Sequence, residues 1–353
     1  MQIWDTYPSD YRAAEVRVIV AAAQAGECTA LAGLSGSGKS NLLGFIANRA
    51  RTASCRFVLV DCNRIDSFSP QAFFRLIRHA LGSTEAASDE LGALDTIIAQ
   101  RQSDWNAVIC LLLDRFDDVA AQAPPALFNN MRALRDAHKY ALAYVATTRR
   151  PLREHTELAE LFYAHPVWLG TFTESDARWN VARYTERKGL QWDRAVADAL
   201  LSLTRGYPSF LRAACEAYAD GAALDVNGLA AHPAVKSRLD EFLSDHPTAD
   251  ELRRSGLDNL PLLLATRPAE FDAQRLTAKE HLLLKYLQAH PEVVCVKDDL
   301  IRAVWPEDQI LERGLRDDSL AQLVRRLREK IEPEPSTPLH IHTVPGRGYR
   351  FTA

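Results

Sequence analysis

Eight residues from Gly33 to Ser40 have the types and spacing of a phosphate-binding loop. Gly33 and Gly38 enclose four free positions, and Lys39 and Ser40 follow directly. Glycine permits a tight turn that points backbone N–H groups inward, and the start of a helix after it adds positive potential for phosphate. Lys39 is then expected to reach the phosphates, and the Ser40 hydroxyl to ligate Mg²⁺. The alternative is a Gly/Ser turn that happens to precede a lysine.

The flanking segments favour the phosphate-binding interpretation. Cys28–Ala32 is a short strand-like run before the loop, and Asn41–Ala47 is apolar and compatible with a helix after it. A chance turn needs neither element. We therefore expect ATP and Mg²⁺ as ligands. The residues expected to hold the nucleotide are Gly33, Gly36, Ser37, Gly38, Lys39, Ser40 and Asn41.

A second apolar run, Val108–Leu113, ends on Asp114. A buried strand of this kind delivers a carboxylate to the C-terminal edge of a parallel sheet, beside a phosphate-binding loop. Asp114 is therefore expected to hold Mg²⁺ through water, together with Ser40. Asp117 or Asp118 is the group expected to polarise an attacking water. The alternative for these last two acids is a solvated turn.

Further strands and helices alternate along the first half of the chain. Arg56–Asp61 is another buried-strand candidate and Pro70–Leu81 is an amphipathic helix, which implies a parallel sheet covered by helices. Tyr140–Ala146 also has the pattern of a buried strand, and Arg149 follows it. Arg149 is expected to sense the γ-phosphate. The alternative is an exposed charge at the strand end.

From Thr173 onward the pattern predicts helices only. Three of them, Glu174–Lys188, Trp192–Thr204 and Ser209–Ala219, are expected to form a small lid. Residues 226–270 either finish this lid or form a connector. The helix-like stretches within them are His232–Ser244 and Asp250–Leu264.

The segment ahead of the loop also has a helical pattern. Residues 8–25 have helical period, with Ser9 or Asp10 as the expected cap. Gly26 is expected to end this helix directly before the strand that leads into the loop.

Residues from about 8 to 225 resemble a P-loop ATPase of the AAA+/STAND group, the branch that includes origin-recognition-like and NACHT-like ATPases. The phosphate loop carries the resemblance. The accompanying matches are Tyr11–Glu15, Asp114–Asp118, Ala146–Arg149 and Gly206–Arg212. The resemblance implies nucleotide contacts from Arg12, Pro208 and Arg212, with Pro208 near adenine. Arg115 and Asp118 depart from the family pattern, so a slow, switch-type ATPase is expected.

The pattern changes again at Leu276. Thr277–Glu280 is a capping box that opens a helix. Two further helices are predicted over Asp298–Val304 and Ser319–Ile331, and the chain closes with two short strands around the Gly-rich tip Pro345–Gly348. Helices followed by such a hairpin are typical of a winged helix.

Polar and basic side chains lie off the apolar stripe of the third helix in this segment. The stripe consists of Leu320, Leu323, Val324, Leu327 and Ile331. Gln322, Arg325 and Arg326 are then available for the DNA major groove or its phosphates. Residues 321–353 hold six Lys and Arg against three Asp and Glu. The alternative is a solvated basic face on an ordinary helix.

The whole segment resembles the winged helix-turn-helix of the OmpR/PhoB response-regulator family. The stretches that carry this resemblance are Leu276–Glu280, Val304–Pro306, Arg325–Arg328 and Thr343–Phe351. The family reads the major groove of double-stranded DNA with the third helix and reaches the minor groove with the wing. The implied contact residues are Ser319, Arg325, Arg326, Arg328, Thr343 and Arg347. The likeness also implies that residues 305–317 touch RNA polymerase, while departures at Ala321 and Pro345 leave the DNA sequence open.

Composition limits the class of protein. A chain of 353 residues with a net charge of −4 is long enough for two or more domains, and any DNA contact must come from a local basic patch. The six cysteines include no Cys-x-x-Cys pair, which predicts small buried residues in a reducing cytosol. No run approaches about 18 apolar residues and no leader pattern opens the chain, so we expect a cytoplasmic protein without membrane contact.

These patterns predict an α/β P-loop NTPase with a parallel sheet and helical lid, followed by a winged helix-turn-helix domain. The expected boundaries are 1–170 for the core, 171–225 for the lid, 226–270 for a connector or the end of the lid, and 271–353 for the winged helix. The favoured function is an ATP-controlled transcription regulator with nucleotide-dependent homo-oligomerisation. One alternative is a DNA-handling ATPase of the origin-recognition or transposition-helper kind. Another is a STAND-like signalling or defence switch whose winged helix contacts protein.

Overall fold

The computed structural model divides the chain into two compact units, Met1–Leu262 and Leu263–Ala353. The residues that the structure describes are 3–50, 52–152, 156–162, 166–266, 276–291, 293–305, 313–332, 335, 338 and 340–352. Parts of two predicted segments, 267–275 and 306–312, lie outside these residues.

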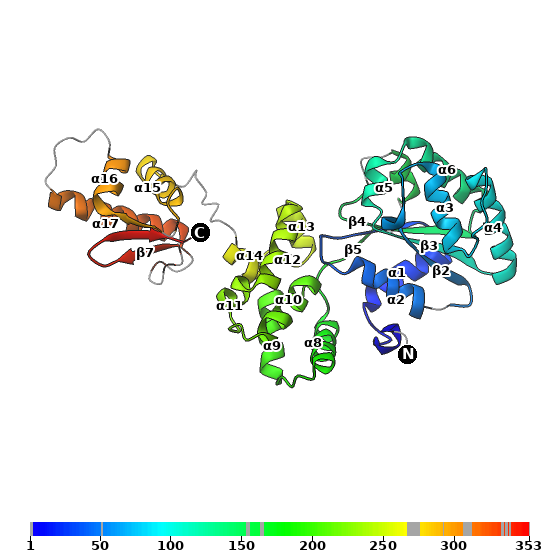
Figure 1. The fold of residues 1–353 in the computed structure, drawn as a ribbon, viewed down its shortest axis with the longest axis horizontal. Helices are drawn as coiled ribbons and strands as arrows, with labels where there is room; N and C mark the ends of the chain where they lie inside the picture. The colour runs from blue at the N-terminus through cyan, green and yellow to red at the C-terminus, as the bar shows by residue number, and fades with distance from the viewer. Residues whose placement is uncertain are drawn as a thin grey trace. The chain divides into compact units, whose positions relative to one another are not determined.

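A five-stranded parallel sheet organises the described part of the first unit (Figure 1). Its strand order is β2-β3-β4-β1-β5, and every neighbouring pair is parallel. The strands are β1 (Thr29–Ala32), β2 (Cys55–Asp61), β3 (Val108–Asp114), β4 (Leu142–Thr148) and β5 (Val167–Trp168). All C-terminal strand ends therefore meet at one edge, and the predicted parallel sheet is confirmed.

Both faces of the sheet carry apolar side chains, and helices cover both faces. Along β3, Ile109 and Leu111 belong to one core cluster and Cys110 to another. On the Cys110 side pack α1 (Ala13–Gln24) and α2 (Lys39–Arg49). The other side is covered by α3 (Pro70–Ala80), α4 (Glu90–Trp105), α5 (Asp117–Gln122), α6 (Pro125–Ala137) and α7 (Thr156–Leu161). The six cysteines of the chain are free and buried, as predicted.

Helices follow β5 and form the lid. Its central helix is α10 (Pro208–Ala219), which contacts α8, α9, α11 and α12. The other helices are α8 (Glu174–Lys188), α9 (Arg194–Thr204), α11 (Val226–Ala231), α12 (Pro233–Ser244) and α13 (Ala249–Arg254). The boundary between the two units falls within the next helix, α14 (Pro261–Thr266). Because α11 and α12 pack on α10, the segment from 226 to 244 is part of the lid.

The start of the chain differs from the prediction. The helix predicted from residue 8 begins only at Ala13, because Arg12 adopts a left-handed conformation with φ of 51°. Neither Ser9 nor Asp10 caps it. A short 3-10 turn, η1 (Ile3–Thr6), precedes it, and another, η2 (Cys62–Arg64), follows β2.

Two further predicted elements have different bounds. The strand predicted from Tyr140 begins at Leu142, because Tyr140 lies in a turn with φ of 66°. The helix predicted over Asp250–Leu264 is interrupted near Gly256, whose φ is 74°. A left-handed residue cannot continue a right-handed helix, so two shorter helices, α13 and α14, replace it.

The described part of the second unit is a winged helix. Its helices are α15 (Ala278–Gln288), α16 (Lys297–Val304) and α17 (Arg313–Ile331), and its strands are β6 (Val294–Val296), β7 (Ile341–Val344) and β8 (Gly348–Phe351). The strands form an antiparallel sheet in the order β6-β8-β7. The predicted capping box of Thr277 and Glu280 is present.

One correction concerns the predicted loop over residues 305–317. The third helix, α17, begins at Arg313 instead of Ser319, so residues 313–317 are helical. A single glycine near a helix start, here Gly314, is tolerated and does not delay the helix. The loop proposed to touch RNA polymerase is therefore shorter than predicted.

Candidate functional site

The phosphate loop connects β1 to α2 and turns on two glycines. Gly36 has a φ of 79° and Gly38 a φ of 91°, in the left-handed region that other residues avoid. A Cβ at Gly36 would also lie 2.1 Å from Ser209 Oγ of the lid. Both positions therefore require glycine.

Lys39 opens α2 and folds back over the loop. Its Nζ donates hydrogen bonds to the carbonyls of Gly33 at 2.5 Å and Leu34 at 3.3 Å. Burial lowers the pKa of Lys39 to about 8, and the negative charge of Asp117 opposes this shift. A buried ammonium bonded to neutral carbonyls is poorly compensated, and an anion in the loop would compensate it. These donors therefore fit a phosphate group.

Asp114 reaches the edge of the sheet at the end of β3, beside the start of α2. Its Oδ1 accepts hydrogen bonds from Ser40 Oγ at 3.0 Å and from Thr147 Oγ1 at 2.9 Å. The N–H of Arg115 donates to the same oxygen at 3.0 Å. A hydroxyl and a carboxylate held together offer the oxygen ligands that Mg²⁺ prefers. The two residues predicted to hold the metal thus lie side by side.

Asp117 and Asp118 both begin α5 but have different surroundings. Asp117 is half-buried, and its Oδ1 accepts the N–H of Arg149 at 2.7 Å. Burial raises the pKa of Asp117, and its charge acts on Lys39. Asp118 is exposed. Of the two predicted water-polarising residues, Asp117 is the one whose carboxylate is held near the phosphate loop.

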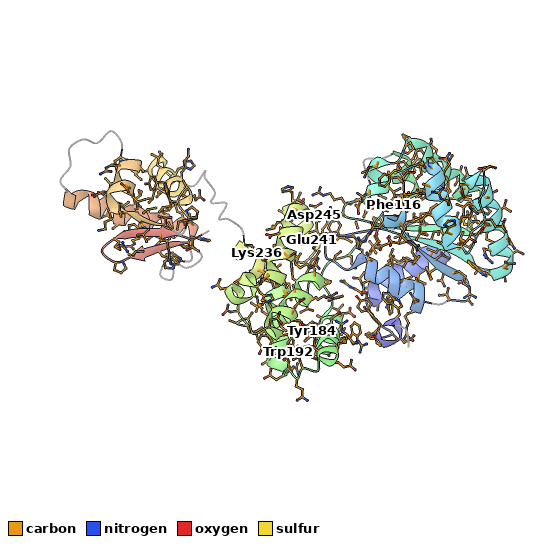
Figure 2. The ribbon with its side chains drawn as sticks, in the orientation of Figure 1. Phe116, Tyr184, Trp192, Lys236, Glu241 and Asp245 are labelled. Carbon is orange, nitrogen blue, oxygen red and sulfur yellow. The ribbon has the colours of Figure 1, made fainter. Side chains whose placement is uncertain are left out.

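Arg149 follows β4 and pairs with the lid. Its Nη1 lies 2.9 Å from Asp245 Oδ1. Asp245 lies directly after α12 (Figure 2). Arg150 makes a similar ion pair with Glu251 at 2.8 Å. A cavity of about 280 Å³ lies here, and Leu34 of the phosphate loop lines it together with Arg149 and Asp245. Ion pairs therefore join the edge of the sheet to the lid next to the loop.

The tip of the phosphate loop also contacts the lid through Ser35. The Tyr207 hydroxyl donates to the Ser35 carbonyl at 2.7 Å. The Ser35 hydroxyl donates to Glu241 of α12 at 3.2 Å. The loop tip is thus bonded to two separate parts of the lid.

The first turn of α10 docks on the same loop. The N–H of Ser209 donates to the Gly36 carbonyl at 3.1 Å. Pro208 approaches the Cβ position of Gly38 to 3.7 Å. Arg212 lies one turn further along α10 and is exposed. The structure therefore places Pro208 against the loop and Arg212 beyond it.

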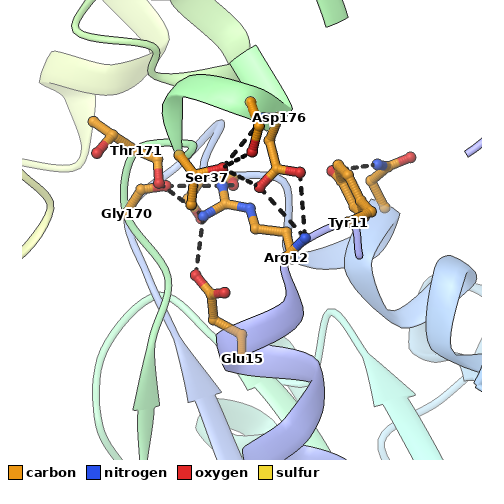
Figure 3. A network of polar contacts seen from close by, with 10 residues as sticks. Tyr11, Arg12, Glu15, Ser37, Gly170, Thr171 and Asp176 are labelled. Atoms are coloured by element: carbon orange, nitrogen blue, oxygen red, sulfur yellow. Dashed lines mark hydrogen bonds and ion pairs between the residues drawn. The ribbon is translucent and has the colours of Figure 1, made fainter. Parts of the chain in front are cut away.

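Arg12 lies in a network that ties the loop to the segment before the lid (Figure 3). Its Nη2 donates to the carbonyls of Ser37 at 3.3 Å and Gly170 at 3.0 Å, and its Nη1 to that of Thr171 at 2.8 Å. Nη1 also pairs with Glu15 at 3.2 Å, and the residue is 2% exposed. In the structure Arg12 positions the loop. Its contact with a nucleotide stays a prediction.

A larger cavity of about 640 Å³ opens at the start of α2. Asn41 lines it, and the hydroxyls of Tyr7 and Tyr11 each bond to its amide at 2.9 Å. Tyr7 packs on Trp179 of α8, with ring centroids 4.5 Å apart. Aromatic walls beside a phosphate loop suit a nucleoside.

The predicted DNA-contacting side chains lie on one exposed face of α17. Leu320 and Leu323 are buried in the domain core, as the stripe predicts. The exposed residues are Ser319, Gln322, Arg325 and Arg326. Arg325 Nε lies 3.1 Å from Glu329 and its side chain is 81% exposed, so the guanidinium remains accessible.

Two of the other predicted DNA contacts bond to each other. Arg328 Nη2 donates to Thr343 Oγ1 at 2.9 Å and to the Ile341 carbonyl at 2.5 Å. These bonds tie α17 to strand β7 of the wing. Arg347 is exposed at the wing tip, where its N–H donates to the Val344 carbonyl at 3.0 Å.

Sequence reasoning missed several residues of the site. Thr147 lies in the stretch Ala146–Arg149, which resembles the P-loop ATPase group, but no sequence pattern predicts its hydrogen bond to Asp114. Asp245 precedes a His-Pro pair that indicates only a helix end. Trp179 has the spacing of an ordinary helix residue.

Comparisons with known proteins match the two units separately. A family model described as Novel STAND NTPase 1 matches residues 11–212. A model described as Transcriptional regulatory protein, C terminal, matches residues 272–351. The matches agree with both resemblances found in the sequence.

The curated relatives match part of the chain. The uncharacterized transcriptional regulatory protein YcbL of Bacillus subtilis (strain 168) is 30% identical over 119 residues, which cover 32% of this chain and 49% of that protein. The sensory transduction protein RegX3 of Mycobacterium bovis is 34% identical over 114 residues, covering 28% of this chain and 48% of that protein. The chain thus spans about half the length of these relatives.

Among solved structures, the Walker-type ATPase PABY2304 of Pyrococcus abyssi is similar in fold. Its TM-score is 0.51 at 14% identity, over 96% of this chain and 92% of that chain. In the described part of the chain, no helix is long and apolar enough to cross a membrane.

Proposed function

The chain belongs to the novel STAND NTPase 1 family and carries a transcriptional regulatory C-terminal domain, and from this premise we propose that it is a nucleotide-controlled transcription regulator. It binds ATP with Mg²⁺, hydrolyses it slowly, and uses the nucleotide state of the first unit to set DNA binding by the second.

The ion pair between Arg149 and Asp245 carries this proposal. It joins the end of strand β4 to the lid, and both residues act electrostatically on Lys39. A γ-phosphate beside Lys39 would attract Arg149 and repel Asp245. Because the chain passes from the lid into the second unit, a lid that moves with nucleotide state supplies a physical link to the winged helix.

Three residues beside the phosphate loop are assigned to hydrolysis. Ser40 and Asp114 would hold Mg²⁺, which neutralises charge on the phosphates when bound. Asp117 would orient water, since its raised pKa suits a group that accepts a proton. Its Oδ1 accepts the N–H of Arg149, which fixes the direction of the carboxylate. The departures from the family pattern at Arg115 and Asp118 support slow turnover.

DNA binding is assigned to α17 and the wing. Gln322, Arg325 and Arg326 would meet the major groove and its phosphates, and Arg347 the adjacent minor groove. Arg328 and Thr343 would act by fixing the angle between helix and wing. RNA polymerase and a nucleotide-dependent homo-oligomer are the further partners that we propose.

The test is a DNA-binding titration of the full chain with ADP, with a non-hydrolysable ATP analogue, and without nucleotide. Genomic fragments selected by the protein itself supply the DNA. A difference in affinity between nucleotide states that disappears in Lys39→Ala supports the proposal. Turnover stimulated by any duplex without sequence preference would point to a DNA-handling ATPase instead.

A further inference from the structure

The larger cavity continues outward between two rows of side chains. The rows are Trp179, Arg183 and Arg187 on α8, and Pro208, Arg212 and Glu216 on α10. Members of each row are four residues apart, so they follow one another on one helix face in steps of roughly 6 Å. The cavity therefore has levels of different chemistry along its length.

The inner level is apolar and lies next to the phosphate loop. Pro208 approaches the Cβ position of Gly38 to 3.7 Å, and Trp179 packs against Tyr7. A nucleotide with its 5′ phosphates in the loop, as proposed above, has its nucleoside at this level. If the 2′ and 3′ hydroxyls of the ribose turn away from the loop, they face the next level.

Arginine side chains line the outer levels of the cavity. Among the described residues that line the cavity, the basic side chains outnumber the carboxylates, of which Glu216 is the single one. The basic residues are Arg183, Arg187, Arg212 and Arg238. Arg183 pairs with Glu186 at 2.6 Å and Arg238 with Glu241 at 2.5 Å.

The other two arginines, Arg187 and Arg212, make no hydrogen bond or ion pair with any residue that the structure describes. Their charges, from two helices that face one cavity, repel each other unless an anion lies between them. Guanidinium groups match phosphate oxygens in a two-point geometry, so phosphate is the anion that they suit best.

We propose that the outer part of the cavity binds a second phosphate, attached to the ribose of the nucleotide whose 5′ phosphates lie in the loop. Arg183 and Arg187 of α8 would hold it from one side and Arg212 of α10 from the other. This inference rests on the proposed nucleotide binding. A bisphosphorylated mononucleotide and the 5′ end of an oligonucleotide share this chemistry.

The test compares AMP with adenosine 3′,5′-bisphosphate and adenosine 2′,5′-bisphosphate by calorimetric titration of the full chain. These ligands differ from AMP only in the second phosphate. One bisphosphate is expected to bind about tenfold more tightly than AMP. In the double variant Arg183→Gln/Arg187→Gln the preference falls to about twofold or less, while AMP affinity is retained.

A matched control is Arg178→Gln on the same helix. Arg178 pairs with Glu174 and Asp198 and does not line the cavity, so the preference should persist. The dinucleotide pApA distinguishes the two ligand classes. If it binds as tightly as the bisphosphate, the natural ligand is the 5′ end of an oligonucleotide. If it binds more weakly, the natural ligand is a bisphosphorylated mononucleotide. Both results support a second phosphate subsite.

Equal binding of AMP and both bisphosphates by the natural protein would overturn the proposal. It would also be overturned if Lys39→Ala left the binding of ADP that carries a further phosphate on its ribose unchanged, because the 5′ phosphates would then lie outside the loop. Neither result depends on DNA, so a failure of nucleotide-controlled DNA binding is seen separately.

Discussion

Arg149 Nη1 lies 2.9 Å from Asp245 Oδ1, so the edge of the sheet and the lid share one ion pair. The Asp245 side chain is 11% exposed, whereas that of Arg149 is 60% exposed. Asp245 Oδ2 is buried and has no hydrogen-bond partner in the described part of the chain. The Arg149 guanidinium is therefore accessible to another anion, whereas the Asp245 carboxylate is held in the ion pair.

Asp245→Asn should shift nucleotide preference toward ATP. The amide no longer holds Arg149 or repels a γ-phosphate, so the ratio of ATP to ADP affinity is expected to rise by about three- to tenfold. Calorimetric titrations with ADP and a non-hydrolysable ATP analogue measure it. Asp250→Asn, which removes the exposed partner of Arg253 on the lid, is the control. An unchanged ratio in Asp245→Asn would remove this ion pair from the mechanism.

Arg12→Ala should destabilise the first unit strongly. The substitution leaves the carbonyls of Ser37, Gly170 and Thr171 without their buried donor, and a loss of about 3 kcal/mol in unfolding free energy is expected. Urea unfolding followed by circular dichroism measures it. Arg194→Ala on α9, where the side chain is 83% exposed, should leave the transition midpoint almost unchanged. Equal effects of the two substitutions would refute the role of Arg12 in positioning the phosphate loop.

Nucleotide affinity should fall above about pH 8. Burial lowers the pKa of Lys39 to about 8 in the free protein, and a bound phosphate raises it again by attraction. Below pH 7 Lys39 is charged in both states, so Lys39 contributes no pH dependence to the affinity. Above about pH 8 binding takes up a proton and affinity falls by up to about tenfold per pH unit.

Titrations with ADP in two buffers of different ionisation enthalpy measure this proton uptake. Lys39→Arg stays protonated throughout and is expected to lose the pH dependence. A flat profile for the natural protein up to pH 9.5 would show that Lys39 is already charged over this range.

Arg326→Ala and Arg328→Ala should separate DNA contact from domain stability. Arg326 is exposed, so its loss should weaken DNA binding and lower the slope of log affinity against log salt by about 1, with an unchanged melting temperature. Arg328→Ala removes the bonds to Ile341 and Thr343 and should lower the melting temperature. Fluorescence anisotropy and thermal denaturation measure the two effects. A loss of DNA affinity in Arg328→Ala without a lower melting temperature would mean that Arg328 contacts DNA directly.

Local constraints made much of the site predictable. Gly36 and Gly38 are fixed by left-handed backbone, and Lys39 follows them directly, so a short motif contains the chemistry. Asp114 was predictable because a fully apolar strand that ends on an acid delivers it to the sheet edge. The exposed face of α17 was predictable from the helical spacing of its apolar residues.

The rest of the site depends on contacts between distant segments. Asp245 lies 96 residues from Arg149 and ends an ordinary amphipathic helix, so no local pattern links them. Arg328 and Thr343 were both predicted as DNA contacts. Their bond to each other depends on how the wing returns to α17, which helix periodicity does not specify.

The central claim is that nucleotide state sets DNA affinity, and one measurement tests it most directly. The full chain is titrated on its own selected genomic DNA with ADP and with a non-hydrolysable ATP analogue, in parallel with Lys39→Ala. We predict affinities that differ by about tenfold between the two nucleotides and become equal in the variant. Identical DNA affinity in all of these conditions would contradict the account.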